Sequence, residues 1–131
     1  MQKKIIIVAL ILSAQPALAC QIPAGWQEMA TEVSTDLTVA AKIPAQPIKT
    51  GARFSIDVMV CGETMKAAKV EMDATMPAHK HGMNYIPEVK KLSPEQFQAT
   101  GMFFHMPGQW QVTVDLKDEN TQRFYLDVTA Q

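Results

Sequence analysis

A two-residue hydrophobic period recurs along the chain and constrains its fold more than any other feature. Apolar and polar side chains alternate in five runs, which is typical of β-strands with one buried face. These runs cover residues 37–43, 54–60, 70–76, 110–116 and 124–128. The weaker candidates 83–87 and 96–104 raise the expected number to about seven short strands, with turn-forming residues between them.

The rest of the pattern fits the same fold class. No convincing amphipathic helix is present, and only a turn is expected around Ser93-Pro94-Glu95. Short alternating strands with turn signals predict an all-β fold, an antiparallel immunoglobulin-like β-sandwich. Residues 20–34 lack clean alternation, so we expect an N-terminal tether there and the sandwich domain over residues 35–131.

The first 19 residues are typical of a cleavable signal peptide. Lys3 and Lys4 precede the apolar run 5–12, and Ala17-Leu18-Ala19 provides the small residues of a cleavage site. The apolar run is too short to span a bilayer, which takes about 20 residues. We therefore expect a protein that is exported to the periplasm or secreted in soluble form, without a transmembrane helix.

The only two cysteines are Cys20 and Cys61. In an oxidising compartment a lone pair of cysteines usually joins, which predicts a Cys20–Cys61 disulfide that pins the tether. The alternative is a lipoprotein, because Ala17-Leu18-Ala19-Cys20 resembles a lipobox, although Ala17 stands where leucine is usual. Cys20 would then be acylated and anchored to a membrane, and Cys61 would be free.

Charge and motifs exclude several function classes. Loss of Lys3 and Lys4 with the signal peptide lowers the net charge from −1 to −3, which gives no basic surface for nucleic acid. Neither a G-x-S-x-G serine nor an H-E-x-x-H zinc-protease motif is present. A nucleophilic Cys61 would have to be reduced, which an oxidising compartment disfavours. We therefore expect no enzyme.

Histidine and methionine cluster in the middle of the chain. All three histidines fall between positions 79 and 105, and five of the nine methionines fall between 72 and 106. These methionines are Met72, Met76, Met83, Met102 and Met106. Thioether sulfur selects Cu(I) and imidazole suits copper or zinc, whereas calcium would require carboxylates. The cluster predicts a copper site, Cu(I) first, with zinc as the second choice.

Spacing suggests which of these residues could share an ion. His79, His81 and Met83 are two apart, so in an extended segment their side chains leave on the same face. If successive strands run up and down, the loops after the third and fifth strands emerge at the same end, which adds His105 and Met106.

The proposed ligands follow from this placement. Pro107-Gly108 is typical of a type II turn, which would re-aim His105. The predicted ligands are His79, His81, Met83 and His105, with Met106 or Met76 as the alternative sulfur.

Each candidate also has an ordinary structural interpretation. Met72 and Met76 share the apolar parity of their strand and are typical core fillers, and Met102 has no clear parity. His105 follows Phe104 and could be a core histidine bonded to backbone. His79 and His81 flank Lys80, whose charge would repel a cation, so an exposed polar turn is the other interpretation of that stretch.

Three segments carry a family resemblance. They are PIKTGARFSIDVMV (47–60), DATMPAHKHGMNYIP (73–87) and GMFFHMPGQWQVTVDL (101–116). With them the chain resembles the YtkA-like domain family, small exported immunoglobulin-like sandwiches often encoded beside copper or cytochrome-oxidase assembly functions. The resemblance implies the fold more firmly than the function.

A second resemblance covers less of the chain. Periplasmic copper chaperones of the PCu(A)C type carry His-x10-Met-x21-His-x-Met, and Met83 and His105 reproduce the central spacing. Met72 and Pro107 stand where the first histidine and the last methionine would fall, so the full motif is absent.

Three functional hypotheses remain open. The first is an exported Cu(I) carrier or chaperone that serves a periplasmic or membrane protein of copper handling or oxidase assembly. The second is a metal-free immunoglobulin-like accessory module that docks on a periplasmic or membrane oxidase complex. The third is a Zn(II) or Cu(II) site made by the three histidines without sulfur.

Overall fold

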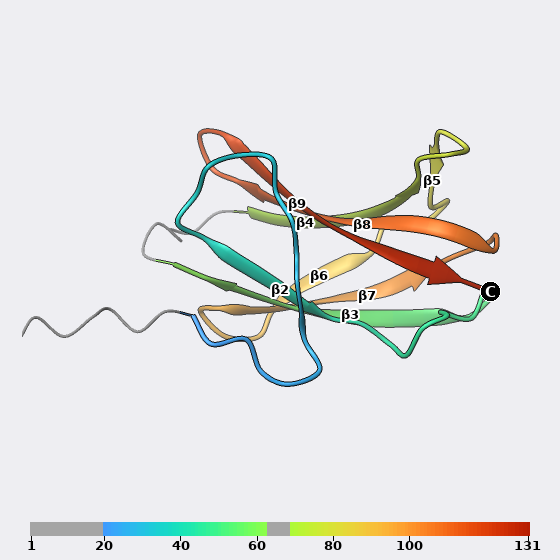
Figure 1. Ribbon diagram of the computed structural model, residues 1–131, viewed down its shortest axis with the longest axis horizontal. Coiled ribbons are helices and arrows are strands. Elements are labelled where there is room, and N and C mark those ends of the chain that lie inside the picture. Colours follow the sequence, from blue (N-terminus) through green and yellow to red (C-terminus); the bar gives the residue numbers. More distant parts are fainter. Residues whose placement is uncertain (1–19, 63–68) are drawn as a thin grey trace, which may run out of the picture.

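Two antiparallel sheets face each other in the computed structural model, which describes residues 20–62 and 69–131 (Figure 1). The described residues form nine strands and no helix. The predicted all-β antiparallel sandwich is thereby confirmed, whereas the predicted signal peptide lies outside the described residues. The described part of the chain also holds no helix that is long and apolar enough to cross a membrane.

The larger sheet has the strand order β1-β2-β3-β7-β6 and the smaller sheet the order β5-β4-β8-β9. The strands of the larger sheet are β1 (Gln27–Glu28), β2 (Thr38–Lys42), β3 (Arg53–Cys61), β7 (Gln96–Phe103) and β6 (Glu88–Lys91). Those of the smaller sheet are β5 (His81–Gly82), β4 (Lys69–Met76), β8 (Gly108–Lys117) and β9 (Thr121–Ala130).

Six of the expected strands are present. The five alternating runs correspond to β2, β3, β4, β8 and β9, and the weaker candidate at 96–104 corresponds to β7. The other weak candidate, 83–87, is wrong, because that segment connects β5 in one sheet to β6 in the other. The short strands β1, β5 and β6 were not expected, since two to four residues are too few to display a period.

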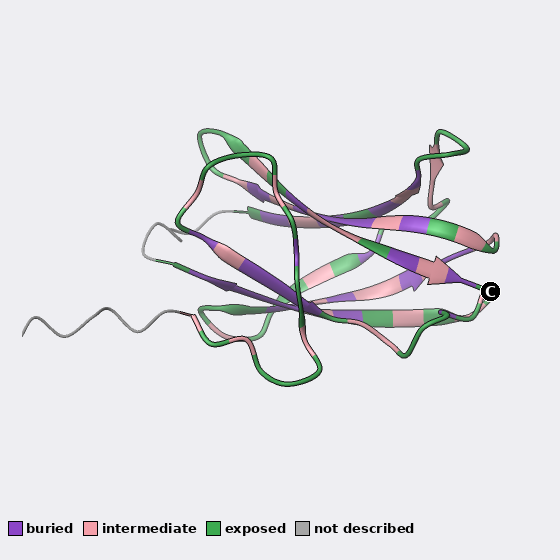
Figure 2. Ribbon diagram, viewed as in Figure 1, coloured by how far each residue is buried: buried purple, intermediate pink, exposed green. Residues whose placement is uncertain are grey.

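The core lies between the inward faces of the two sheets, as the buried stripes along the strands in Figure 2 show. The largest fully buried side chains there are Trp110, Phe104 and Phe124. Burying a side chain of this size stabilises the fold by about 1.5–3 kcal/mol. Trp110 and Phe104 also stack on each other, with ring centroids 4.4 Å apart and planes 9° from parallel.

The predicted tether packs against the sandwich. β1 pairs with β2, and Met29 is only 4 % exposed in the core. Ala30 and Tyr125 exchange two backbone hydrogen bonds of 2.9 and 2.8 Å, which joins this segment to β9. The segment therefore contacts both sheets.

The predicted Cys20–Cys61 disulfide is confirmed. It joins the start of the described chain to the end of β3, with the two Cα atoms 6.0 Å apart. Neither cysteine is free. Because its sulfur is bonded to Cys61, Cys20 has no thiol left for the acylation that a lipoprotein would need.

Candidate metal centre

The β4–β5 connection places two of the histidines. β4 ends at Met76, whose carbonyl accepts hydrogen bonds of 3.0 Å from the backbone N–H of both His79 and Lys80. Lys80 has a φ of 55°, in the left-handed region that reverses the chain. His79 therefore lies in the turn and His81 in β5. The expected straight segment with His79, His81 and Met83 on one face is wrong, because it ignores this reversal.

The third histidine lies in the β7–β8 connection. The chain bends at Met106, and Gly108 begins β8 with a φ of 127°. This value departs from the roughly +80° of a type II turn, so the predicted turn is wrong in detail. The indole Nε1–H of Trp110 donates a hydrogen bond of 2.9 Å to the Met106 carbonyl and holds the connection against the core.

The two connections meet at one end of the sandwich, as the strand directions predicted. The ring centroids of His81 and His105 are 5.2 Å apart, and those of His79 and His81 are 5.8 Å apart. An imidazole nitrogen binds a metal at about 2.0–2.1 Å, so two rings that share one ion have centroids within roughly 6.5 Å. Both pairs of neighbouring rings satisfy this condition.

The described residues do not form a finished metal site. Among them, no three His, Cys, Asp or Glu side chains are gathered closely enough to hold an ion as they stand. His79 is exposed in a turn, so its ring is free to rotate toward an ion. The pair His81 and His105 is the preorganised part of the candidate site.

The donor atoms of this pair are available for a ligand. His81 Nδ1 lies 3.3 Å from the Gly82 carbonyl. In the tautomer in which Nδ1–H donates to this carbonyl, Nε2 is the lone-pair donor. His105 Nδ1 is buried and has no hydrogen-bond partner. Leaving a buried polar atom unpaired costs about 1–3 kcal/mol, so a partner such as a bound ion or a water is expected at this nitrogen.

Trp110 lies beside these imidazoles, although its sequence pattern predicts only a core residue. Its ring is fully buried and lies 6.1 Å from His81 and 5.5 Å from His105 between centroids, at interplanar angles of 72° and 80°. With Phe104 stacked on it, the indole forms an aromatic wall beside both imidazoles. Its position five residues after His105, at the start of an alternating run, was the only sequence signal.

The candidate sulfurs differ in their surroundings. Met83 is partly buried against the core, and its N–H donates a hydrogen bond of 3.1 Å to the Ala74 carbonyl. Met106 is also partly buried. Met76 is 1 % exposed and is the direct register partner of His81. Met72 and Met102 are buried in the core, at 6 % and 0 % exposure.

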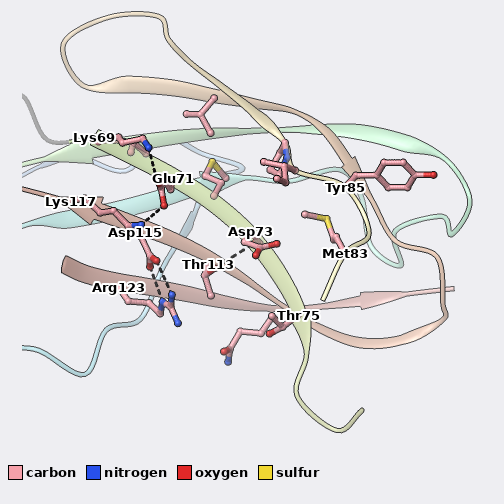
Figure 3. Close-up of a pocket in the computed structure, with 16 residues that line it drawn as sticks. Lys69, Glu71, Asp73, Thr75, Met83, Tyr85, Thr113, Asp115, Lys117 and Arg123 are labelled. Atoms are coloured by element: carbon pink, nitrogen blue, oxygen red, sulfur yellow. Dashed lines mark hydrogen bonds and ion pairs between the residues drawn. The ribbon is translucent and has the colours of Figure 1, made fainter. Parts of the chain in front are cut away.

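A second feature, the β4 groove, lies beside β4, extends over outward-facing side chains of β8 and β9, and has a volume of about 750 Å³. Figure 3 shows Met83 and Tyr85 on the segment beyond β5, which forms one wall. The next residue, Ile86, is 97 % exposed. The sequence pattern does not reveal this groove, because its wall depends on where the segment 83–87 crosses between the sheets.

Five charged side chains on the opposite wall of the β4 groove form ion pairs with one another. Glu71 contacts Lys117 and, at 2.7 Å, Lys69 (Figure 3). The hydrogen bond from Lys117, followed by that from Lys69, lowers the pKa of Glu71 from 4.5 to about 2. Arg123 donates two hydrogen bonds of 2.7 Å to Asp115, and this carboxylate raises the pKa of Arg123.

Comparison with known proteins identifies the family. The sequence model of the YtkA-like family matches residues 31–115, more than half of the chain. The chain belongs to the YtkA-like family. Neither the curated proteins nor the solved structures include a significant match. The YtkA-like region contains all three histidines and Trp110, so the candidate metal centre lies within the family's domain.

Proposed function

We propose that this YtkA-like protein is an exported copper carrier that binds Cu(I) through His79, His81, His105 and a methionine sulfur, which the sequence predicts to be Met83, with Met106 or Met76 as the alternative. One observation carries the proposal. The unpaired, buried Nδ1 of His105 lies in a ring 5.2 Å from that of His81. A metal ion bound by both imidazoles would satisfy that nitrogen.

The chemistry of these donors supports Cu(I) over a divalent ion. Imidazole and thioether are neutral, so they do not offset the charge of the ion, and a monovalent ion leaves the smallest charge beside buried aromatic rings. The exposed Lys80 also lies between His79 and His81 in the chain, and its repulsion is weaker for a monovalent ion. Zinc therefore remains the second choice.

The exposure of His79 supports delivery as the role of the bound ion. This histidine lies in an exposed turn at the rim, whereas the other two are partly buried. A rim ligand that rotates away would open a coordination position for a donor of a receiving protein. We therefore propose transfer to a periplasmic or membrane protein of copper handling or oxidase assembly.

The decisive experiment is a Cu(I) titration of residues 20–131 in competition with a chromophoric chelator. The variant His81→Ala/His105→Ala should bind Cu(I) about 100-fold more weakly, which corresponds to about 2.7 kcal/mol. Gln109→Ala, an exposed polar change on β8 close to the same loop, should leave the affinity unchanged. Wild-type protein that binds no Cu(I) below micromolar concentration would end the carrier proposal.

Parallel titrations with Zn(II) and Cu(II) test the sulfur-free alternative. A site made by three histidines alone would bind these ions with unchanged affinity when methionine is replaced by leucine. A Cu(I) carrier instead loses Cu(I) affinity when its sulfur ligand is removed, while its binding of divalent ions changes little.

The β4 groove favours a second candidate function, a metal-free module that binds a partner protein. β5 pairs with β4 only at Thr75 and Met76. The Ala74 carbonyl accepts a hydrogen bond from this edge, so by strand alternation Met72 and Val70 also direct their backbone groups toward it. An extended partner segment could add to the sheet along this edge, beside the exposed Ile86.

The two candidates separate in a cellular assay of copper tolerance or oxidase assembly. Ile86→Asp should abolish function if partner docking is the main role, and His81→Ala/His105→Ala should then have no effect. The carrier proposal predicts the reverse. Leu92→Asp, at a site that is 56 % exposed and does not line the β4 groove, is the matched surface control.

A further inference from the structure

The position of Met76 distinguishes it from the other methionines that could supply the sulfur ligand of the candidate metal centre. Met76 is the last residue of β4, and by its alternation and burial it resembles a core residue. Its register partner is His81 in β5. Directly opposed residues of two antiparallel strands project on the same face, with their Cβ atoms about 4.5–5.5 Å apart. The Met76 and His81 side chains therefore leave the backbone next to each other.

The far end of the Met76 side chain reaches the connection that carries His105. A Cβ atom built on Gly108 would lie 3.0 Å from the Met76 Cε. Gly108 follows His105 by three residues. The absence of a side chain at Gly108 leaves the space that the methyl group of Met76 occupies, and the sulfur is one bond from that methyl. The thioether thus lies between the β5 histidine and the loop of the third histidine.

Neither of the other candidate methionines lies in a strand opposite a histidine. Met83 follows β5 and lines the β4 groove. Met106 presents its backbone carbonyl to Trp110.

We infer that Met76 supplies the sulfur ligand of the copper site, an inference that rests on the proposed Cu(I) function. In this arrangement His81 Nε2, His105 Nδ1 and Met76 Sδ form the inner ligand set, and His79 is the outer, exchangeable ligand. The buried Nδ1 of His105 and the buried thioether suit each other, because an ion that binds both is shielded from water.

Burial of this thioether has two consequences for function. Thioether sulfur selects Cu(I) over Zn(II), so Met76 sets the metal preference of a site that otherwise offers imidazoles alone. A methionine in an oxidising compartment is also subject to oxidation to the sulfoxide, a polar group. At 1 % exposure Met76 is protected from oxidants in solution in a way that the partly buried Met83 is not.

The first test compares two conservative variants of β4. Met76→Leu should weaken Cu(I) binding at least tenfold and leave Zn(II) affinity unchanged. Met72→Leu, on the same face of the same strand and also buried, should change neither affinity. X-ray absorption of the Cu(I) protein should show a copper–sulfur shell that disappears in Met76→Leu and persists in Met83→Leu and Met106→Leu.

The second test needs no substitution and so does not depend on a variant that folds. Wild-type protein labelled with ¹³C at the methionine methyl groups is titrated with Ag(I), a redox-inert mimic of Cu(I). The methyl resonance of Met76 should shift at one equivalent while that of Met72 stays in place. The inference is overturned if the Met83 or Met106 resonance shifts instead, or if the sulfur shell survives in Met76→Leu.

The same measurements separate this inference from the proposed function. Wild-type protein that binds Cu(I) with nitrogen ligands only leaves the carrier proposal standing and refutes the role of Met76. Wild-type protein that binds no Cu(I) refutes both.

Discussion

The two ends of the sandwich use their metal-ligating side chains in opposite ways. At one end Cys20 and Cys61 are bonded to each other, so neither sulfur is available for chemistry. At the other end the three imidazoles lie side by side, and the buried Nδ1 of His105 has no partner. β3 runs from one end to the other, a distance of roughly 26 Å for its nine residues (Figure 1).

The difference also concerns what holds each end together. The disulfide closes a loop with a sequence separation of 41 residues. The histidine end is held by the stacked Trp110 and Phe104 and by backbone groups, namely the carbonyls of Met76 and Met106. None of these interactions uses an imidazole nitrogen. Stability and metal binding should therefore be separable by mutation, one at each end.

The largest expected effect on stability comes from the disulfide end. Cys20→Ala/Cys61→Ala should lower the free energy of unfolding by about 4 kcal/mol, the loop-closure entropy for a loop of this length. Chemical denaturation at pH 7 measures this loss. Cu(I) affinity under native conditions should not change, because the histidine end keeps its own supports. A parallel loss of Cu(I) affinity would contradict the separation of the two ends.

A smaller effect should appear at the histidine end, but there it should include metal binding. Trp110→Phe removes the donor to the Met106 carbonyl and part of a fully buried ring. We expect a loss of about 2–3 kcal/mol in unfolding free energy, because an unpaired carbonyl and a small cavity remain. Cu(I) affinity should fall too, since the indole holds the connection that carries His105.

Trp26→Phe is the matched control for this variant. Trp26 is partly buried in the N-terminal segment, away from the histidines, so its replacement should leave Cu(I) affinity unchanged. If both variants reduce copper binding equally, Trp110 has no specific role in positioning His105.

The difference between the two ends also explains how much could be predicted from the sequence. Long strands such as β3, β4 and β8 each bury one face in the core, so apolar and polar residues alternate along them and the strands can be recognised from the sequence. The prediction that His79, His81 and His105 gather at one end is confirmed, but its strand count was wrong: β6, which was not expected, reverses the chain in place of the predicted strand at 83–87. The cysteine pair was predictable from its number and its expected compartment.

The finer geometry of the site could not be predicted, because it depends on contacts between distant segments. β5 has only two residues, too few for an alternating hydrophobic pattern. The left-handed turn residue is Lys80, whereas glycine is the residue from which such a turn would be predicted. The register of Met76 with His81 and the close approach of Gly108 to the Met76 side chain both depend on this turn and on this short strand. Hence the sequence indicated which residue types meet and left Met83, Met106 and Met76 as alternative sulfurs, and only the register distinguishes Met76 among them.

The smallest expected effect lies between the two ends, on the outward face of β4. Glu71→Gln removes a carboxylate whose pKa Lys117 and Lys69 lower from 4.5 to about 2. A lowered carboxylate pKa contributes stability that is present above pH 4.5 and is lost as the pH falls from there toward 2. The variant should therefore lose less stability than wild type over this range, with little difference at pH 7, because exposed ion pairs are well solvated.

Urea unfolding at pH 7 and pH 3 measures this pH dependence. Glu88→Gln is the control, because its carboxylate is highly exposed and lies 3.6 Å from the equally exposed Lys90. Cu(I) affinity at pH 7 should be the same in both variants and in wild type, since Glu71 pairs with Lys69 and Lys117 and not with a residue of the histidine end. Equal pH slopes for wild type and Glu71→Gln would show that Lys69 and Lys117 hold no ionised partner in solution. A changed Cu(I) affinity would instead mean that the charged face of β4 is coupled to the histidine end through Met76.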